Sequence, residues 1–271
     1  MDSSTIPAEV RRDRILNLIE AQGFVRVAEL GAKFGVSDVT IRSDLDFLAR
    51  VSLIERVHGG AKLPGPSSLV VASPAEREPS FEESVDTYAS DKAAIGRAAA
   101  ALVSNGDSIV IDVGTTADAL ARALVARSDL SDVVVFTSGI PIAMRLEPAI
   151  PRFTVVVTGG TLRPKQHSLV NPMGLSILDQ INVDTAFIGC NGINATEGVT
   201  NINLPEAQIK RHMIHAARRV VVIADGTKIG RASVARLAHI GEVDRLITSD
   251  SAPSEALDEF RELGVEVTVA R

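Results

Sequence analysis

One stretch near the middle of the chain has the residue types of an anion-binding turn. Asp112 is followed closely by Gly114, Thr115 and Thr116, after an apolar segment and before a segment with helical periodicity. A glycine and two threonines at the start of a helix offer free backbone N–H groups, two hydroxyls and the positive end of the helix dipole, which suit a phosphate group. Because the same residues also form ordinary N-caps, this turn alone leaves phosphate binding and plain capping equally open.

Comparable loops follow four other apolar segments in the same part of the chain. They begin at Thr137, Thr158, Gly189 and Ala224, and each is small, polar or rich in glycine. Glycine lets a ligand approach the backbone, and cationic side chains in such loops attract an anion. This recurrence favours a ligand pocket over ordinary turns. The candidate ligand-binding residues in the loops are Asp112, Gly114, Thr115, Thr116, Ser138, Gly139, Gly159, Gly160, Arg163, Asn191, Gly192, Asp225 and Lys228.

The apolar segments themselves are predicted to be buried strands. They lie at residues 107–113, 133–136, 153–157, 185–188, 220–224 and 245–248. Helical segments at 92–104 and 117–127 alternate with them, which indicates an α/β domain with helices on both faces of a parallel sheet. Since such sheets bind ligands beyond the carboxyl ends of their strands, we expect the loops to converge on one pocket.

A second stretch, near the N-terminus, has the pattern of a DNA-reading helix. Ser37 is a candidate N-cap, and Asp38 behind it places negative charge where the helix dipole favours it. Ile41, Leu45 and Leu48, spaced four and three apart, mark one apolar face. Short polar side chains and an arginine lie outside that face, in the first two turns of the helix. A helix of this kind suits insertion into a DNA major groove.

A short basic hairpin follows this helix. Residues 53–58 alternate like a strand and stop at Gly59-Gly60, a turn signal. Two further helices are predicted at 8–22 and 27–34, so we interpret the N-terminal part as a winged helix-turn-helix, with an unrelated helical bundle as the alternative. The candidate DNA-binding residues are Ser37, Thr40, Ile41, Arg42, Ser43, Arg50, Arg56, His58 and Gly59.

Composition excludes several classes of protein. Of the 271 residues 45% are hydrophobic, which is ample for packed cores, and no apolar run approaches the ~18 residues that span a bilayer. Only 3% are aromatic and none is Trp, so stacking on single-stranded nucleic acid is not expected. The single cysteine, Cys190, and an N-terminus without a hydrophobic signal region indicate a cytoplasmic protein. The histidines lack ligand spacing, so neither a metal nor another cofactor is expected.

Charge and composition also divide the chain. Residues 1–63 hold nine Lys and Arg and nine Asp and Glu, so the formal net charge of −6 belongs to the remainder. Prolines, serines and glutamates concentrate directly after residue 63, as in a linker. We therefore predict a DNA-binding domain at 1–63, a linker at 64–90 and an acidic effector domain at 91–271.

The motifs together resemble the DeoR family of bacterial transcriptional regulators. The N-terminal part matches the family's order of a capping Ser37, then Thr40-Ile41-Arg42, Asp44-Leu45 and Arg56-Val57-His58-Gly59-Gly60-Ala61. The matching motifs in the second part are Asp112-x-Gly-Thr-Thr, Gly159-Gly160-x-Leu162-Arg163-Pro164, Ser168-Leu169-Val170, Glu206-Ala207-x-x-Lys210-Arg211 and Ala224-Asp225 with Lys228-x-Gly230-Arg231. The resemblance covers nearly the whole chain, from Arg11 to Asp250.

The resemblance implies a function for each part. The family's C-terminal domain is similar in fold to ribose-5-phosphate isomerase and typically senses phosphorylated sugars, which adds Ser168, Glu206 and Lys210 to the candidate effector-binding residues. Because one reading domain covers a short half-site, a homo-oligomer (dimer or tetramer) on a double-stranded DNA operator is expected. This sequence departs from the family's pattern at Ser52, Ser138-Gly139, Asn171 and Gly226-Thr227. The identity of the sugar is therefore left open.

A sugar-phosphate isomerase with an appended DNA-binding domain is the alternative interpretation. Isomerisation needs a carboxylate base beside the substrate and a group that stabilises the enediolate. Asp112, Glu206 and Asp225 are candidate carboxylates, with Lys210 and Lys228 as partners. The acidic loop of such isomerases is missing, however, and a Glu and a Lys four apart on a helix are often only a surface pair. The sequence favours a repressor of carbohydrate-metabolism genes that a phosphorylated sugar releases, and not an enzyme.

Overall fold

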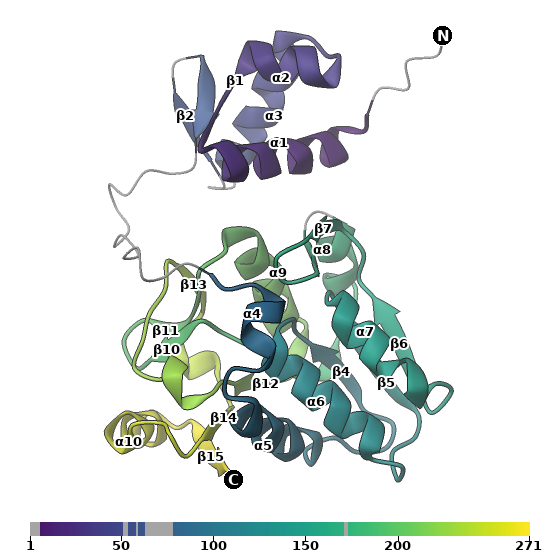
Figure 1. Cartoon of the computed structure of the whole chain (residues 1–271), viewed down its shortest axis with the longest axis vertical. Coiled ribbons are helices and arrows are strands. Elements are labelled where there is room, and N and C mark those ends of the chain that lie inside the picture. The colour runs from purple at the N-terminus through teal and green to yellow at the C-terminus, as the bar shows by residue number, and fades with distance from the viewer. Residues whose placement is uncertain (1–5, 51–53, 58, 63–77, 171–172) are drawn as a thin grey trace. The chain divides into compact units, whose positions relative to one another are not determined.

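The computed structural model describes residues 6–50, 54–57, 59–62, 78–170 and 173–271 of the chain (Figure 1). Two units divide the chain, Met1–Val71 and Ala72–Arg271. Each has a hydrophobic core of its own. None of the helices in the described part combines the length and the apolarity that crossing a membrane requires.

The N-terminal unit joins helices to a small antiparallel sheet. Its helices are α1 (Ala8–Gln22), α2 (Val27–Phe34) and α3 (Asp38–Arg50), and its strands are β1 (Phe24–Arg26), β2 (Glu55–Val57) and β3 (Gly60–Lys62). The strand order is β1-β3-β2, so β1, which the sequence analysis did not predict, extends the sheet of the wing. The arrangement confirms the predicted winged helix-turn-helix.

Local sequence signals set the ends of these helices. Gly23 (φ 76°) ends α1 and donates its N–H to the carbonyl of Ile19 at 2.8 Å. Gly35 (φ 65°) ends α2 in the same left-handed conformation. The Oγ of Ser37 then accepts a hydrogen bond from the N–H of Thr40 at 3.2 Å, which starts α3. The core between the helices consists of fully or almost fully buried Ile15, Ile19, Leu30, Ile41 and Leu45.

The second unit is built on a seven-stranded parallel sheet. Along the chain its strands are β4 (Ser108–Ile111), β5 (Val133–Thr137), β6 (Phe153–Val157), β9 (Val183–Ile188), β12 (Ala217–Ile223), β14 (Arg245–Ser249) and β15 (Glu266–Ala270). Their order across the sheet is β15-β14-β12-β9-β4-β5-β6. The parallel α/β fold is thus confirmed. The edge strand β15 was missed because only continuous apolar runs were read as strands in this part of the chain, whereas its alternation of polar and apolar residues is also a strand pattern.

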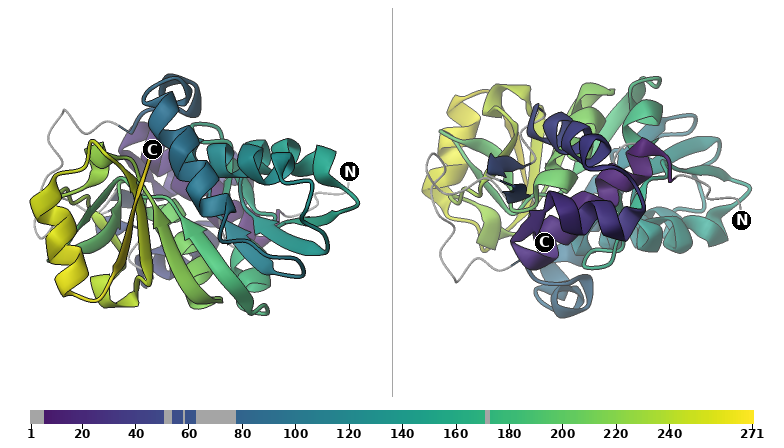
Figure 2. Two further views of the ribbon diagram at one scale, coloured as in Figure 1. Left: turned by 90° about the horizontal axis from the view of Figure 1, so that it is seen from below. Right: turned by 90° about the horizontal axis from the view of Figure 1, so that it is seen from above.

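Helices cover both faces of this sheet (Figure 2). α5 (Ala89–Ala100), α6 (Thr115–Ala126) and α7 (Ile140–Leu146) pack against Ile109 and Ile111 on one face. α9 (Leu204–His215) and α10 (Ser254–Glu262) belong to the core on the other face, which includes Val110. Consecutive residues of β4 therefore enter opposite cores, as the geometry of a strand requires.

Smaller elements complete the second unit. β7 (Thr161–Arg163) and β8 (Ser168–Val170) form an antiparallel hairpin after β6, and α8 (Met173–Leu178) follows it. β10 (Gly192–Asn194), β11 (Gly198–Asn201) and β13 (Ala235–Ala238) form a second small antiparallel sheet. Short 3-10 helices lie at Glu147–Ala149, Gly226–Lys228 and Ile240–Glu242.

The C-terminal part of the segment assigned to a linker is folded. Residues 78–90 belong to the second unit and contain α4 (Phe81–Val85) and the start of α5. A capping box begins α4, in which the Oγ of Ser80 accepts from the N–H of Glu83 at 3.2 Å and Glu83 accepts in return at 2.7 Å. Glu78 is buried. The prolines, serines and glutamates that suggested a spacer serve here as helix-starting residues; residues 64–77 of the predicted linker lie outside the described residues.

Candidate functional site

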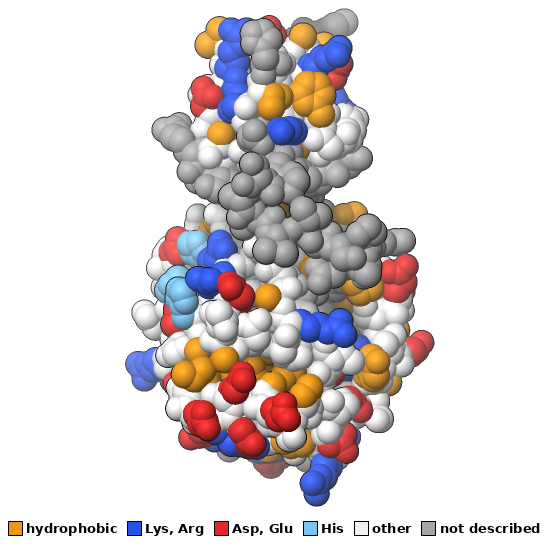
Figure 3. Space-filling view, turned by 90° about the vertical axis from the view of Figure 1, so that its left-hand side faces the viewer, with side chains coloured by type: hydrophobic (Ala, Val, Ile, Leu, Met, Phe, Trp, Pro, Cys, Tyr) orange, Lys and Arg blue, Asp and Glu red, His pale blue; other side chains and the backbone are white. Residues whose placement is uncertain are grey.

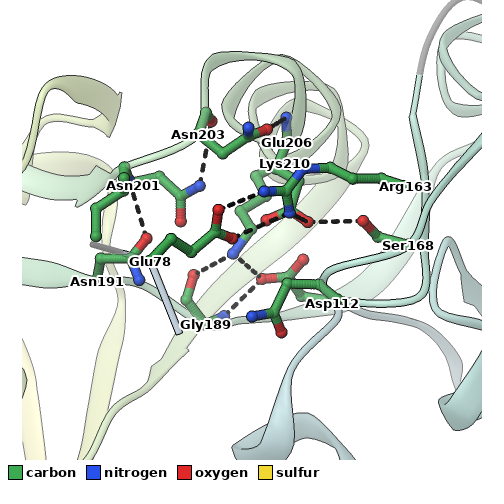
Figure 4. A network of polar contacts seen from close by, with 12 residues as sticks. Glu78, Asp112, Arg163, Ser168, Gly189, Asn191, Asn201, Asn203, Glu206 and Lys210 are labelled. Carbon is green, nitrogen blue, oxygen red and sulfur yellow. Dashed lines mark hydrogen bonds and ion pairs between the residues drawn. The ribbon is translucent and has the colours of Figure 1, made fainter. Parts of the chain in front are cut away.

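The end of β4 is tied to α9 by a buried ion pair. The Nζ of Lys210 on α9 lies 2.8 Å from Oδ2 of Asp112, and both side chains are almost fully buried. Lys210 also donates to the carbonyl of Gly189 at 3.0 Å, while the N–H of Gly189 donates to Oδ2 of Asp112 at 2.9 Å (Figure 4). The ends of β4 and β9 and the middle of α9 are therefore fixed together by one lysine and one aspartate.

Burial and charge act against each other in this pair. Burial raises the pKa of Asp112, and the ammonium of Lys210 opposes that rise. Burial lowers the pKa of Lys210, but the carboxylates of Asp112 and Glu206 outweigh it, so the pKa of Lys210 is raised. In each group, the opposite charge of the other is the largest influence that opposes burial.

A second group of charges adjoins the first. The Oε1 of Glu206 accepts hydrogen bonds from the guanidinium of Arg163 at 2.8 Å and from the Oγ of Ser168 at 2.6 Å. Arg163 also forms an ion pair with Glu78 (Figure 4). The Oδ1 of Asn203 accepts from the N–H of Glu206 at 3.0 Å and caps α9, which fixes the position of the Glu206 backbone.

A cavity of about 250 Å³ opens above these two groups. Among the predicted effector residues, the cavity is lined by Gly114, Thr115, Thr116, Asn191, Glu206, Lys210, Asp225 and Lys228. The predicted loops after β4, β9 and β12 therefore converge, as the sheet topology required. Lining residues that the sequence analysis missed include Glu78, Glu83, Thr87, Tyr88, Lys92, Gln166 and Asn201.

The cavity has the charge and backbone geometry to hold an anion. Gly114 (φ 106°) directly precedes α6, so the N-terminus of this 12-residue helix faces the cavity through residues 114–116. Lys92, Lys210 and Lys228 also line it. The Nζ of Lys92 donates to the carbonyls of Ser84 and Thr87 at 2.7 Å, and burial lowers the pKa of its ammonium. These cations offset the carboxylates in the same wall.

The remaining predicted effector residues do not line the cavity. Asp112, Arg163 and Ser168 lie behind its wall in the charge networks. Ser138 and Gly139 pair with the β7–β8 hairpin, since the carbonyl of Ser138 accepts from the N–H of Leu169 at 2.7 Å and Gly139 bridges to Ser168. Gly159 and Gly160 take positive φ between β6 and β7, and Gly192 packs against the backbone of Arg231. These glycines are outside the lining of this cavity, and their contact with a ligand stays a prediction.

Asp225 and Cys190 have local roles beside the cavity. The Oδ1 of Asp225 accepts from the N–H of Thr227 at 3.0 Å and caps the short helix that carries Lys228. Burial raises the pKa of the Cys190 thiol to about 12, so it is an unreactive small residue of the wall. Within the described ranges, no group of three or more His, Cys, Asp and Glu side chains is arranged to hold a metal ion.

In the N-terminal unit, α3 presents the predicted reading surface. Arg42 and Ser43 are exposed, and the Oγ atoms of Ser37 and Thr40 are hydrogen-bonded at 2.9 Å. Ile41 is a correction: its side chain is fully buried in the core, so it cannot contact DNA. It belongs to the apolar face that the periodicity had already indicated. Figure 3 shows several Lys and Arg side chains on the visible face of this unit, with hydrophobic and acidic side chains between them.

The wing is fixed to α3 by one arginine. Arg56 on β2 donates to the carbonyl of Arg42 at 3.1 Å and to Asp46 at 2.9 Å. Gly59 (φ 80°) forms the turn of the hairpin, and its carbonyl accepts from the N–H of Val27 at 3.0 Å. His58 and the side chain of Arg50, both predicted DNA contacts, lie outside the described residues.

A buried charge cluster orients α3 against α1. Asp44 on α3 accepts from Arg11 at 2.6 Å and from Arg12 at 2.9 Å, and Asp44 and Arg11 are both buried. The guanidinium of Arg12 also stacks 4.1 Å from the ring centroid of Phe47. Val39, which the sequence analysis did not single out, is 72% exposed in the first turn of α3.

These features define a ligand-responsive DNA-binding protein, with a winged reading domain and a separate α/β domain that holds a cavity suited to an anion. A family model for the DeoR-like helix-turn-helix domain matches residues 11–66, and one for the DeoR C terminal sensor domain matches residues 87–250. The chain belongs to the DeoR family of transcriptional regulators. Family membership identifies it as a DNA-binding regulator and not as an enzyme.

Individual relatives agree with this assignment. The putative aga operon transcriptional repressor of Escherichia coli O157:H7 is 32% identical over 95% of this chain and 92% of its own length. The glycerol-3-phosphate regulon repressor of Escherichia coli (strain K12) is 32% identical over 90% of this chain and 91% of its own length.

Among solved structures, ribose 5-phosphate isomerase A from Methanocaldococcus jannaschii aligns over 51% of this chain and 52% of its own, with 21% identity and a TM-score of 0.37.

Proposed function

We propose that this regulator is a repressor of carbohydrate-metabolism genes and that a phosphorylated sugar, or a sugar derivative, releases it from its operator. The observation that carries the ligand class is the cavity, in which the N-terminus of α6 and three lysines face the same space. The similarity to two Escherichia coli proteins that are named as repressors supports the direction of regulation.

The lining of the cavity suggests which protein groups would contact each part of such a ligand. Its phosphate group would accept hydrogen bonds from the backbone at residues 114–116 and from Lys92 or Lys228. Its hydroxyl groups would bond to Asn191, Asp225 and Glu206 on the facing wall. Because a cavity of about 250 Å³ is small, the ligand is a compact monosaccharide or a smaller polyol rather than a nucleotide.

On the DNA side, we propose that α3 enters a major groove. Ser37, Thr40, Arg42 and Ser43 would contact base edges or nearby phosphates, and residues of the wing would contact the backbone. Arg56 contributes indirectly, because its bonds to Arg42 and Asp46 set the position of the wing. The proposed backbone contacts are Arg50, His58 and Gly59. A homo-oligomer in the cytoplasm would place two such helices on repeated half-sites.

A thermal-shift screen of the full chain against phosphorylated and unphosphorylated forms of the same small sugars and polyols tests the ligand class. A ligand at 100 times its Kd should stabilise the protein by roughly 2.7 kcal/mol. The hit should also release the protein from an operator fragment obtained by selection. Stabilisation by the unphosphorylated form alone would contradict the proposal.

A further inference from the structure

Residues 78–82, at the start of the second unit, lie along the turn between β7 and β8. We refer to the paired segments 78–82 and 163–167 as the clasp. Arg163 forms an ion pair with Glu78 in the clasp, and His167 forms a hydrogen bond with Glu82 at 2.5 Å. In addition, Gln166 donates to the carbonyl of Pro79 at 2.7 Å, and the N–H of Phe81 donates to the carbonyl of Lys165 at 2.9 Å. The clasp therefore attaches the chain that leads from the DNA-binding unit to a hairpin beside the cavity.

Glu78 separates Arg163 from the cavity. Glu78 and Glu206 line the cavity, whereas Arg163 lies behind them. The guanidinium contacts Oε1 of Glu78 at 3.0 Å and Oε1 of Glu206 at 2.8 Å (Figure 4). Glu78 and Glu206 are buried, and the side chain of Arg163 is 11% exposed. Glu78 thus occupies the position from which an oxyanion in the cavity would contact Arg163.

The charges and hydrogen bonds of this network favour Glu78 as the carboxylate that an anionic ligand would displace. Asp112, Glu206 and Glu78 are three carboxylates, while Lys210 and Arg163 are two cations, so the network has a formal charge of −1. A second anion in the adjacent cavity would add repulsion at low dielectric constant. Asp112 and Glu206 are additionally held by hydrogen bonds from Gly189 and Ser168. Within the part of the chain that the structure describes, the side chain of Glu78 bonds to Arg163 alone.

We propose that Arg163 is an anion subsite of the cavity, that Glu78 fills it in the ligand-free protein, and that an oxyanion of the ligand takes its place. A phosphate or carboxylate presents the same pair of oxygens to a guanidinium as Glu78 does. Displacement would remove the most buried contact of the clasp and free residues 78–82 from the hairpin. This inference rests on the proposed anionic effector, and it adds the place where binding changes the chain that leads to the DNA-binding unit.

Glu78→Gln tests the subsite, because it removes the charge and keeps the size of the side chain. Isothermal titration of the full chain with inorganic phosphate should show binding about fivefold or more tighter than in the wild type. Glu147→Gln is the control, since it removes one exposed carboxylate from the same unit and lies outside the clasp. Adding Arg163→Gln to Glu78→Gln should abolish the gain. Equal tightening in both single variants, or no tightening in Glu78→Gln, overturns the proposal.

Hydrogen exchange of the wild-type protein provides the second readout and needs no variant. Saturating phosphate should accelerate exchange of the Phe81 amide, which is bonded to Lys165 in the clasp. Phosphate binding without faster exchange in residues 78–82 overturns this inference and leaves the anion cavity standing. Absence of binding by phosphate to both the wild type and Glu78→Gln removes the anion cavity, and with it both proposals. If Glu78→Gln fails to fold by urea unfolding, the wild-type exchange measurement decides.

Discussion

Lys210, near the middle of α9, places its Nζ 2.8 Å from Oδ2 of Asp112 at the end of β4, and both side chains are buried beneath the cavity. The sequence analysis treated the four-residue spacing of Glu206 and Lys210 as a possible surface pair. In the structure both residues point into the protein and bond to different partners, Glu206 to Arg163 and Ser168, and Lys210 to Asp112. One helix, α9, therefore supplies one residue to each of two adjacent ion pairs in the wall of the cavity.

Lys210→Met should destabilise the second unit strongly. Removing one partner of a buried ion pair leaves the other charge uncompensated, which typically costs about 3–5 kcal/mol. Urea unfolding at neutral pH measures the loss. The double variant Asp112→Asn with Lys210→Met serves as the control, and it should be more stable than Lys210→Met alone because no buried carboxylate remains unpaired. Wild-type stability in Lys210→Met would show that the ion pair contributes nothing.

The same variant should respond to pH in a defined direction. Burial already raises the pKa of Asp112, and loss of Lys210 removes the group that opposes the rise. A carboxyl with a folded-state pKa above its unfolded value is stabilising below the unfolded pKa, and that stability is lost as pH rises through the folded pKa. The deficit of Lys210→Met relative to the wild type should therefore shrink as pH falls from 7 towards 4.

Thr115→Glu should abolish the response to the effector and leave DNA binding intact. The new carboxylate would lie at the N-terminus of α6, where the proposed phosphate group binds, and would repel it. Operator binding with and without the effector identified by thermal shift measures both properties. Thr116→Ser is the matched conservative variant and should respond as the wild type does. A Thr115→Glu protein that still releases DNA would show that the phosphate lies elsewhere.

Arg42→Ala should weaken specific operator binding by about 1–3 kcal/mol if the side chain reads a base. Arg42 is exposed on α3, and its backbone carbonyl holds Arg56 of the wing, a contact that the substitution keeps. Gel-shift titrations on specific and scrambled DNA separate base reading from phosphate contact. Arg218→Ala, which removes an exposed arginine of the second unit, should leave both affinities unchanged. Equal loss on both DNAs would assign Arg42 to the phosphate backbone.

Sequence periodicity predicted the strands β4, β9 and β12 and the helix α6, because each carries its own apolar pattern. It missed α4, which was assigned to the linker, and the hairpin of β7 and β8. The loops after β4, β9 and β12 also meet as predicted, since parallel topology brings carboxyl ends to one edge. Ile41 was misassigned because it lies inside a DNA-reading motif, although its spacing with Leu45 had marked it as core. The apolar pattern was the better guide at that position.

Glu78 and Lys92 could not be placed at the cavity from sequence. Each comes from a segment whose local signals concern capping or helix formation, and its distance from β9 or β12 depends on tertiary packing. One missed signal was present: Asn203, followed by a proline at the start of α9 and then by Glu206, is a helix N-terminal pattern. It would have shown that Glu206 lies in the first turn of a helix.

Glu82→Gln should remove part of the acid sensitivity of the second unit. Hydrogen bonds, the largest contribution being that of His167 and the others those of the Glu82 backbone and Ser80, lower the pKa of Glu82 from 4.5 to about 2 in the folded protein. A carboxyl with a depressed folded-state pKa contributes stability that is present above its unfolded pKa and is lost as pH falls through the folded value. Between pH 4.5 and 2 the wild type should therefore lose stability more steeply than Glu82→Gln. Urea midpoints at matched pH values measure the difference, with Glu147→Gln as an exposed carboxyl-to-amide control. Parallel midpoint curves for the wild type and Glu82→Gln would show that His167 does not hold Glu82 in solution.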